Sequence, residues 1–395
     1  MNKKHSSFQF WIIISIVAIS GFSQGMLLPL IAVIFENSGV SSSLNGFHAT
    51  AIYIGTLLAA PFMEKPLRKI GYKPLIAIGT MLVIVSMLMF PVWQSFWFWF
   101  VLRLIIGVGD QILHFGTQTW ITATSPGHKR GRNIAIYGFF FSFGFAIGPV
   151  MTRLVEINEF LPFWVASGLS FIVWCFLLTV RNEFPEEEMQ NENTKNDTSF
   201  IRFGKAWRIA WVAFLPPFGY GFLEASLHGN FPVYALRIGI SVDQLSLILP
   251  AFAIGSLITQ MPLGVLSDLL GRQRLLQLVM IGGLLAFVTA SFVESSFWGL
   301  LICLTTAGML VGSTFSLGLS FMADLLPKNL LPAGNLLCSI CYSVGSIIGP
   351  FIGGVYIQWF PNGSFFYILS GMLLLIFISL AFFKQKEYTY ITKTS

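Results

Sequence analysis

Apolar stretches long enough to cross a lipid bilayer recur along the whole chain, separated by short polar loops. A membrane-spanning helix needs about 20 mostly apolar residues. The first six predicted spans are residues 10–34, 46–64, 74–93, 97–123, 134–155 and 162–180. The second six are residues 208–235, 244–266, 275–293, 297–323, 333–357 and 364–383. The pattern predicts an all-α membrane protein with twelve transmembrane helices.

The composition agrees with a protein that lies mostly in lipid. Hydrophobic residues make up 55% of the 395 residues and charged residues only 10%, whereas soluble domains carry about 25% charged residues. The first apolar run continues through Phe35 without a cleavage pattern, so it predicts a retained span and not a signal peptide. We therefore expect the lipid bilayer to surround most of the chain.

One long polar stretch divides the spans into two sets of six. It predicts an N-terminal six-helix bundle at 1–181, a cytoplasmic linker at 182–207 and a C-terminal six-helix bundle at 208–395. The two sets also repeat at an offset near 200, because Gly21-Phe22 corresponds to Gly221-Phe222 in sequence. Internal duplication of this kind is typical of transporters whose halves rock around a central site, with pseudo-two-fold symmetry between them.

Basic residues predict the orientation in the membrane. Twenty of the 23 Lys and Arg residues fall on the side of the N-terminus if the spans alternate in direction. Since cytoplasmic loops carry the excess of Lys and Arg, both termini are predicted to be cytoplasmic, in a multi-pass protein of the cell membrane. The net charge of +6 is spread over many short loops, so it does not indicate nucleic-acid binding.

Ionisable side chains within predicted spans are the candidates for function, because they are costly in lipid and mark substrate or proton pathways. Arg103, Asp110 and His114 share one face of the fourth span, and Glu224 lies four residues before His228 in the seventh. A carboxylate and a His one turn apart can share a hydrogen bond and exchange a proton. The further predicted cavity residues are Gln24, at the same offset as Glu224, and Thr117, Gln118, Tyr220 and Asn230.

A structural interpretation of the same residues is also open. Asp110 could neutralise Arg103 as a helix-to-helix ion pair, and both His residues could be hydrogen-bonded packing residues. Cys338 and Cys341 have the spacing of a metal or redox pair, but no second pair or neighbouring His completes a site. We therefore expect no metal and no cofactor.

Three short motifs contain small residues and charges at regular spacing. Gly264, Asp268, Gly271 and Arg272 form a loop signature after the eighth span, and Arg68 stands where the repeat would place the acid after the second span. The expected role of these glycines is tight helix contact, and that of Asp268 is charge pairing at a cytoplasmic gate. The third motif, a Gly-x-x-x-Gly-Pro pattern that lets helices approach closely, occurs in the fifth and eleventh spans as Gly144, Gly148 and Pro149 and as Gly345, Gly349 and Pro350.

These motifs, together with Arg103-x-x-x-Gly107-x-Gly109, resemble those of the major facilitator superfamily over essentially the whole chain, in particular those of its multidrug/proton antiporter-like branch. The resemblance implies two six-helix bundles, a cavity lined by the first, fourth, seventh and tenth spans, and energy from an ion gradient. The loop after the second span departs from the family pattern at Arg68, which leaves open whether it still gates.

Three functions remain open from the sequence. The first is proton-coupled efflux of a small organic solute by alternating access, and the second is proton-coupled uptake of a sugar or an organic anion, with Arg103 as the counter-charge for an anion. The third is a non-transporting sensor with this fold. The sequence lacks phosphate-binding, zinc-protease and nucleophile-elbow motifs, so we expect no enzyme. The expected partners are a small-molecule substrate and H⁺, and the chain is predicted to be a monomer.

Overall fold

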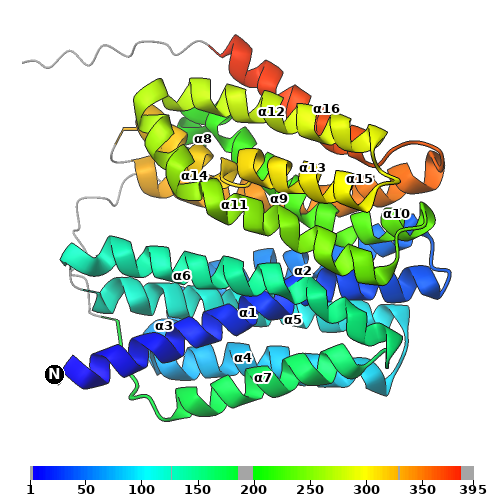
Figure 1. Ribbon diagram of the computed structural model, residues 1–395. Coiled ribbons are helices and arrows are strands. Elements are labelled where there is room, and N and C mark those ends of the chain that lie inside the picture. The colour runs from blue at the N-terminus through cyan, green and yellow to red at the C-terminus, as the bar shows by residue number, and fades with distance from the viewer. Residues whose placement is uncertain (1–2, 126, 186–198, 328–329, 384–395) are drawn as a thin grey trace, which may run out of the picture.

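The computed structural model describes residues 3–125, 127–185, 199–327 and 330–383, and all of its regular elements are helices. Residues 186–198 of the predicted linker lie outside the described residues, as do the basic residues Lys195, Lys328, Lys384, Lys386 and Lys393. Below, residues 3–185 are called the N-terminal half and residues 199–383 the C-terminal half. Figure 1 shows the two halves side by side, each a group of roughly antiparallel helices.

The N-terminal half begins with the longest helix, α1. Its helices are α1 (Lys3–Asn37), α2 (Ser42–Ala59), η1 (Ala60–Phe62), α3 (Glu64–Ile70), α4 (Tyr72–Met89), η2 (Phe90–Val92), α5 (Phe96–Thr124), α6 (Gly127–Ile147), η3 (Gly148–Glu156) and α7 (Leu161–Leu178). Ser41 caps α2 by accepting a hydrogen bond from the backbone of Leu44. Pro149 is the second residue of the 3₁₀ segment η3, which begins where the α-helix of the fifth predicted span ends.

The C-terminal half repeats this order with more interruptions. Its helices are α8 (Ser199–Ala210), η5 (Trp211–Phe214), α9 (Leu215–Gly229), α10 (Phe231–Arg237), α11 (Val242–Leu270), α12 (Arg272–Phe292), α13 (Phe297–Val311), α14 (Thr314–Leu325), α15 (Leu331–Trp359) and α16 (Phe366–Phe382). Ser241 and Gln244 form a reciprocal capping box at the start of α11. Gly39 and Gly239, which precede the capped helices in the two halves, both have positive φ, of 74° and 89°.

The helices account for the predicted spans, although two of them are short. Within the described residues, nine helices are long and apolar enough to cross a membrane, or ten if α2–η1 and α3 count as one span bent by 62°. The predicted spans 208–235 and 364–383 correspond to the broken pair α9–α10 and to α16, which has 17 residues. An all-helical membrane protein is therefore confirmed, with a broken seventh span and a short twelfth span.

The internal repeat is visible in how the helices pack. In the N-terminal half α1 packs on α6, and in the C-terminal half α9 packs on α15. A Cβ atom on Gly144 would collide with the backbone carbonyl of Ala18, and one on Gly345 with that of Phe218, 200 residues further on. The two Gly-x-x-x-Gly-Pro motifs therefore hold equivalent helix pairs at backbone contact.

A second pair of close contacts repeats in the same way. Gly55 of α2 lies against the carbonyl of Leu104, and Gly255 of α11 lies against that of Thr305. Thr56 donates a hydrogen bond of 3.2 Å to Gly107 O, which joins α2 to α5. These contacts fix the fourth predicted span against the second, so they set the position of the polar face of α5.

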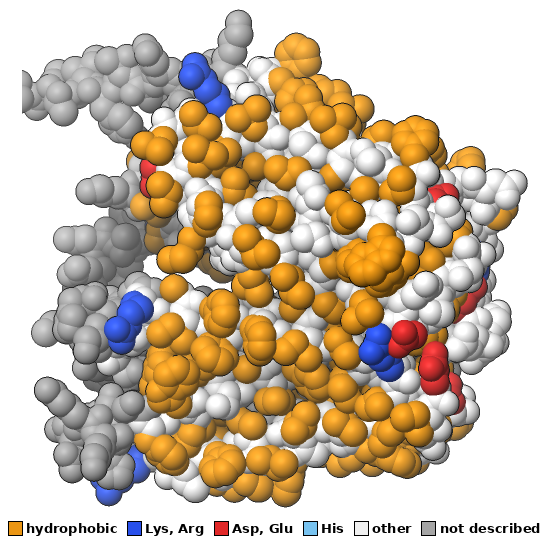
Figure 2. Space-filling model, viewed as in Figure 1, with side chains coloured by type: hydrophobic (Ala, Val, Ile, Leu, Met, Phe, Trp, Pro, Cys, Tyr) orange, Lys and Arg blue, Asp and Glu red, His pale blue; other side chains and the backbone are white. Residues whose placement is uncertain are grey.

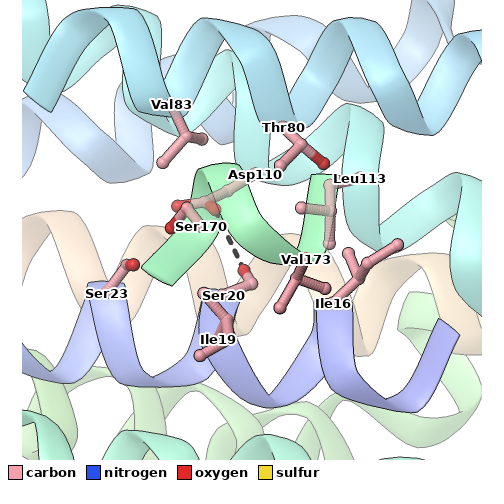
Figure 3. Close-up of a pocket in the computed structure, with 10 residues that line it drawn as sticks. All are labelled: Ile16, Ile19, Ser20, Ser23, Thr80, Val83, Asp110, Leu113, Ser170 and Val173. Atoms are coloured by element: carbon pink, nitrogen blue, oxygen red, sulfur yellow. Dashed lines mark hydrogen bonds between the residues drawn. The ribbon is translucent and has the colours of Figure 1, made fainter. Parts of the chain in front are cut away.

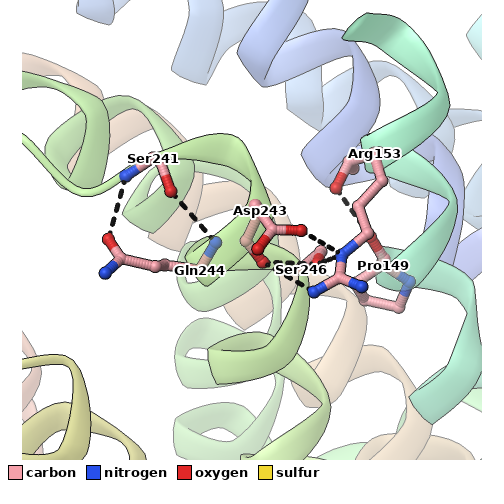
Figure 4. A network of polar contacts seen from close by, with 7 residues as sticks. Pro149, Arg153, Ser241, Asp243, Gln244 and Ser246 are labelled. Atoms are coloured by element: carbon pink, nitrogen blue, oxygen red, sulfur yellow. Dashed lines mark hydrogen bonds and ion pairs between the residues drawn. The ribbon is translucent and has the colours of Figure 1, made fainter. Parts of the chain in front are cut away.

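The two halves are joined at one end of the molecule. Figure 4 shows Arg153 of η3 reaching Asp243 and Ser246 at the start of α11, at 2.8 Å and 2.6 Å from its Nε. At the same end Glu36 and Arg237 form an ion pair at 2.7 Å. We call these two ion pairs the latches, because each joins the N-terminal half to the C-terminal half.

The gating motif after the eighth span is only partly as predicted. Asp268 pairs with Arg272 at 3.1 Å, and Arg272 also contacts Asp324 at 2.6 Å, so the charge pairing is present. Tight helix contact at the glycines is not: a Cβ on Gly264 or on Gly271 would meet nothing within 4 Å. Gly271 instead has a φ of 86°, which an L side chain rarely adopts, so its role is to end α11.

The corresponding loop of the N-terminal half is stabilised by different residues. Arg68 pairs with Glu64 on its own short helix at 2.7 Å, where both side chains are exposed. The segment after α7 packs on the loop, since Asn182 donates to Ile70 O at 2.9 Å and Glu183 O accepts from Tyr72 N at 2.9 Å. Glu183 also accepts from Nε1 of Trp120 on α5 at 2.7 Å. The loop is therefore stabilised by residues that follow the sixth span, and not by an acidic residue at position 68.

Candidate functional site

A cavity of about 470 Å³ lies between the two halves. Figure 2 shows a hollow between the halves toward the end at which α6 begins. The volume is within the range that holds small organic molecules. The cavity is lined by Gln24, Tyr53, Thr56, Asp110, Gln111, His114, Gln118, Tyr137, Gly138, Phe141, Ser142, Phe145, Tyr220, Glu224, His228, Phe252, Ala253, Ser256, Gln260, Gly312, Phe315, Ser316 and Tyr342.

On the N-terminal side, a chain of hydrogen bonds joins Asp110 to His114 through a hydroxyl group. Ser20 Oγ donates to Asp110 Oδ1 at 3.1 Å and lies 3.1 Å from His114 Nε2. The other ring nitrogen, Nδ1, contacts the hydroxyl of Tyr137 at 2.8 Å. When the imidazole carries two protons, Nε2–H can donate to Ser20 Oγ. That hydrogen bond polarises the Ser20 hydroxyl and so strengthens the bond that it donates to the carboxylate.

Gln24 supplies a second partner for the same imidazole nitrogen. Its Nε2 lies 3.1 Å from His114 Nε2 and 3.4 Å from Ser20 Oγ. An amide N–H can donate only to an unprotonated ring nitrogen, so Gln24 fits the neutral imidazole and Ser20 fits the imidazolium. The site therefore offers a hydrogen-bond arrangement for each protonation state of His114.

On the C-terminal side, two tyrosines hold Glu224. Tyr342 of α15 donates to Glu224 Oε2 at 2.6 Å, and Tyr220, one turn before Glu224, donates to Oε1 at 3.3 Å. The tyrosine rings stack on one another at 6.1 Å between centroids. Donors on both oxygens favour a defined carboxylate position facing the cavity.

The two carboxylates do not bond directly to the imidazoles one turn away, contrary to the sequence-based expectation. Ser20 stands between Asp110 and His114, and the partners of Glu224 are the two tyrosines. His228 contacts the ring edge of Phe145 on α6, with centroids 4.7 Å apart, so it contacts the opposite half. The spacing of acid and His therefore identified the cavity-facing sides of α5 and α9. The hydrogen-bond partners of the two carboxylates, however, include residues of the neighbouring helices α1 and α15.

Arg103 is fully buried and lies outside the cavity lining. Its Nη1 donates to His48 Nδ1 at 2.9 Å, and its Nε and Nη2 have no hydrogen-bond partner. The His48 ring lies among Phe35, Phe96 and Phe100. Arg103 is therefore not one of the cavity residues, contrary to the prediction, and it does not form the ion pair with Asp110 that the structural interpretation left open; its contact is with α2.

Seven of the ten predicted site residues line the cavity: Gln24, Asp110, His114, Gln118, Tyr220, Glu224 and His228. Besides Arg103, two others do not. Thr117 donates to Leu113 O within α5 at 2.8 Å, and Asn230 donates to Pro350 O at 3.0 Å at the break between α9 and α10. Asn230 is buried where the eleventh span crosses the seventh, so it joins helices there.

Sequence reasoning missed the tyrosines that position the charged groups. Tyr137 and Tyr342 lie on α6 and α15, which carry the Gly-x-x-x-Gly-Pro motifs. Their positions seven residues before Gly144 and three before Gly345 could have placed them on the packed faces of those helices. The cavity-lining Tyr53 and Gln260 carried no comparable signal.

The fold of the chain is that of known membrane transporters. The chain superposes on the crystal structure of the nucleoside transporter NupG with a TM-score of 0.78, at 12% identity, over 97% of this chain and 100% of that one. A bacterial homologue of the human lysosomal transporter Spinster, solved in an inward-facing and unoccupied conformation, gives a TM-score of 0.72 at 15% identity, over 96% and 95% of the two chains. At these identities the likeness shows the fold alone.

The sequence comparison decides the family. The model of the Major Facilitator Superfamily matches residues 13–237 and 217–393. The chain belongs to this superfamily. It is also 52% identical to the MFS-type transporter YfkF of Bacillus subtilis (strain 168) over 97% of both chains, and 21% identical to the MFS-type transporter YcaD of Escherichia fergusonii over 88% of this chain and 91% of the other.

Membership of the superfamily makes the chain a secondary transporter that moves a small molecule across a membrane, and not an enzyme. Among the described residues no group of three or more His, Cys, Asp or Glu side chains could hold a metal ion. Cys338 and Cys341 are free thiols in α15. The cavity, with its two carboxylates, is therefore the candidate substrate site.

Proposed function

We propose that this transporter exports a small neutral or cationic organic solute in exchange for protons. The observation that carries the proposal is that Asp110 and Glu224, one from each half, line a single cavity of about 470 Å³. Buried carboxylates in a membrane protein are costly unless they bind a proton or a cation. Both groups are therefore placed to exchange protons with a gradient while the cavity holds substrate.

The charges of the lining favour this class of solute over an anion. The lining contains two carboxylates and two imidazoles, and among the described residues that form it there is no Lys or Arg. Arg103, the counter-charge that an anion would need, is buried against His48. Aromatic rings such as Phe141 and Phe315 add surfaces suited to apolar or cationic groups.

The predicted orientation in the membrane indicates to which side the cavity opens. The latches Glu36–Arg237 and Arg153–Asp243 lie at the end opposite to the basic loop that carries Arg272. If that loop is cytoplasmic, as the distribution of Lys and Arg predicts, the latches are extracellular and the cavity is open to the inside. This is the state in which an exporter loads its substrate.

Transport then follows from a change in which state is favoured. Protonation of Asp110 or Glu224 neutralises a carboxylate in the cavity. A proton shifts the balance between the inward-open and outward-open states when the two states bind it with different affinity. That difference shifts the population between the two states as the halves rock around the cavity. Substrate and proton are thereby moved in opposite directions.

Proton-driven uptake of a neutral polar solute such as a sugar is the second candidate. It is favoured by four glutamines in the lining, which are Gln24, Gln111, Gln118 and Gln260. Amide groups donate and accept hydrogen bonds, as hydroxyl-rich solutes require. The two candidates share the carboxylates and differ in the direction of flux.

The test uses purified protein in vesicles with a pH-sensitive dye inside and a panel of cationic and neutral compounds. We expect wild type to use an imposed proton gradient to accumulate a cationic compound against that compound's own concentration gradient. Asp110→Asn and Glu224→Gln should each lose this proton-driven accumulation. If both variants accumulate substrate as wild type does, the proton-coupling assignment is wrong. If no compound moves in either direction, the sensor function is favoured instead.

A matched variant and a reversed gradient complete the experiment. Glu64→Gln removes an exposed carboxylate outside the cavity and should transport as wild type does. Reversing the pH gradient separates the two candidates, because an exporter moves solute opposite to the proton flux and a symporter moves it along with the protons.

A further inference from the structure

Behind the main cavity, a second and much smaller pocket lies on the other side of Asp110. It has a volume of about 10 Å³ and lies between α1, α4, α5 and α7. A cavity needs about 10–15 Å³ to hold one water-sized guest. The pocket is lined by Ile16, Ile19, Ser20, Ser23, Thr80, Val83, Asp110, Leu113, Ser170 and Val173.

The polar atoms of this pocket are all oxygens. Figure 3 shows the carboxylate of Asp110 and the hydroxyls of Ser23 and Ser170 close to one another, with Ser20 donating to Asp110 from below. Thr80 contributes a further hydroxyl to the lining. Carboxylate and hydroxyl oxygens, with no nitrogen donor, are the ligand set that hard cations prefer.

Two of these oxygens have no partner. Asp110 Oδ2 and Ser23 Oγ are buried and make no hydrogen bond, whereas Asp110 Oδ1 already accepts from Ser20. The side chains of both residues are more than nine-tenths buried, with exposed fractions of 4% and 1%. A buried carboxylate oxygen left without a partner costs free energy, so the pocket is incomplete without a guest.

We propose that this pocket is a cation site at which Asp110 binds either a sodium ion or the coupling proton. Oδ2 would bind the ion together with the hydroxyl oxygens of Ser23 and Ser170, and Ser20 would hold Oδ1 in place. A proton on Oδ2 removes the negative charge that attracts the ion, so the two cations exclude one another. The inference rests on the proposed function only in naming the proton as the coupling ion.

The groups around Asp110 allow this competition. His114 is the titratable side chain linked to it, through Ser20, and the pocket-lining residues from α1, α4 and α7 carry no ionisable group. Glu224 belongs to the main cavity, not to the pocket. The negative charge in the pocket therefore depends on the carboxylate of Asp110.

The experiment measures Na⁺ binding to the purified protein without substrate or gradient. At pH 8.5, exchanging N-methyl-D-glucamine for Na⁺ should raise the Tm of wild type by about 2 °C or more, and radioactive Na⁺ should bind in a direct assay. Both signals should fall at pH 5.5, where protons are a thousandfold more concentrated. Both should be lost in Asp110→Asn and weakened at least tenfold in affinity in Ser23→Ala and Ser170→Ala.

Ser167→Ala is the matched control. Ser167 lies one turn before Ser170 on α7, is equally buried, and donates to Phe163 O outside the pocket, so its removal should leave Na⁺ binding unchanged. Absence of Na⁺ binding to wild type at pH 8.5 overturns the proposal, and so does Na⁺ binding that survives in Asp110→Asn. Neither result bears on proton-driven transport, which the vesicle assay tests separately.

Discussion

The hydroxyl of Tyr342 lies 2.6 Å from Oε2 of Glu224 and joins α15 to its neighbour α9 in the wall of the candidate substrate cavity. A hydrogen bond to a charged group contributes about 1.5–3 kcal/mol. We therefore expect Tyr342→Phe to lower the rate of proton-driven transport roughly tenfold. Tyr220→Phe, which removes a bond of 3.3 Å, should lower it less. Initial rates in vesicles at a fixed pH gradient measure both, and equal loss in the two variants would contradict the ranking.

The latches should set the balance between the two open states. Exposed ion pairs contribute about 0.2–1 kcal/mol each, so Glu36→Gln combined with Asp243→Asn should shift the population about two- to thirtyfold toward the state open at that end. Spin labels at Trp93→Cys and Trp298→Cys, two exposed positions on opposite halves, report the distance between the halves. If the distance distribution between the two labels is the same with and without the latch substitutions, the ion pairs do not stabilise the conformation that is closed at this end.

Gly345, which lies at a helix contact, and Gly264, which lies on an open face of α11, should tolerate substitution very differently. Gly345→Ala places a methyl group against the carbonyl of Phe218 and 2.9 Å from Phe222 N, so the helices must separate, at a cost of about 1–3 kcal/mol. Gly264→Ala meets nothing within 4 Å and improves helix propensity by up to about 1 kcal/mol. Thermal unfolding in detergent should show a lowered Tm for the first and an unchanged or raised Tm for the second. The opposite order would refute the close packing of α9 on α15.

Arg103 and His48 should behave as a coupled pair. His48→Leu leaves the buried guanidinium without its hydrogen-bond partner, which should cost about 3–5 kcal/mol if the charge stays buried. Replacing both, as His48→Leu with Arg103→Met, should restore part of that loss, because no buried charge remains. The Tm values of the single and double variants form a double-mutant cycle. A double variant less stable than His48→Leu alone would show that Arg103 has another essential partner.

The length and spacing of the apolar stretches were enough to predict a membrane protein built from helices. Bilayer thickness fixes the length of a span, and the cost of unpaired backbone groups in lipid leaves few structures other than helices. The repeat near 200 residues correctly paired Gly144 with Gly345, and the packing of α1 on α6 and of α9 on α15 confirms it. The break in the seventh span was not predicted, although Pro232 in the first turn of α10 cannot donate a backbone hydrogen bond there. The contact of Asn230 with Pro350, 120 residues away, was decided by the fold.

Most of the site residues predicted from the sequence line the candidate cavity, although they are fewer than a third of its lining. Ionisable and amide groups are so costly in lipid that Asp110, His114, Glu224 and Gln24 had to face the interior of the bundle. The cost of a charge in lipid did not locate Arg103 correctly. That cost predicts only that the side chain points away from lipid, and it does not distinguish a place in the cavity from a buried contact with His48.

The partners of these groups were decided by the tertiary structure. Ser20 between Asp110 and His114, Tyr342 at Glu224, and the oxygen-lined pocket behind Asp110 each join helices that are far apart in the chain. The sequence by itself determined which residues must be shielded from lipid, because that cost depends on each side chain alone. Only the packing of the helices decided what each of them meets, because a hydrogen bond depends on distances of a few ångströms between elements whose positions are fixed by the whole fold.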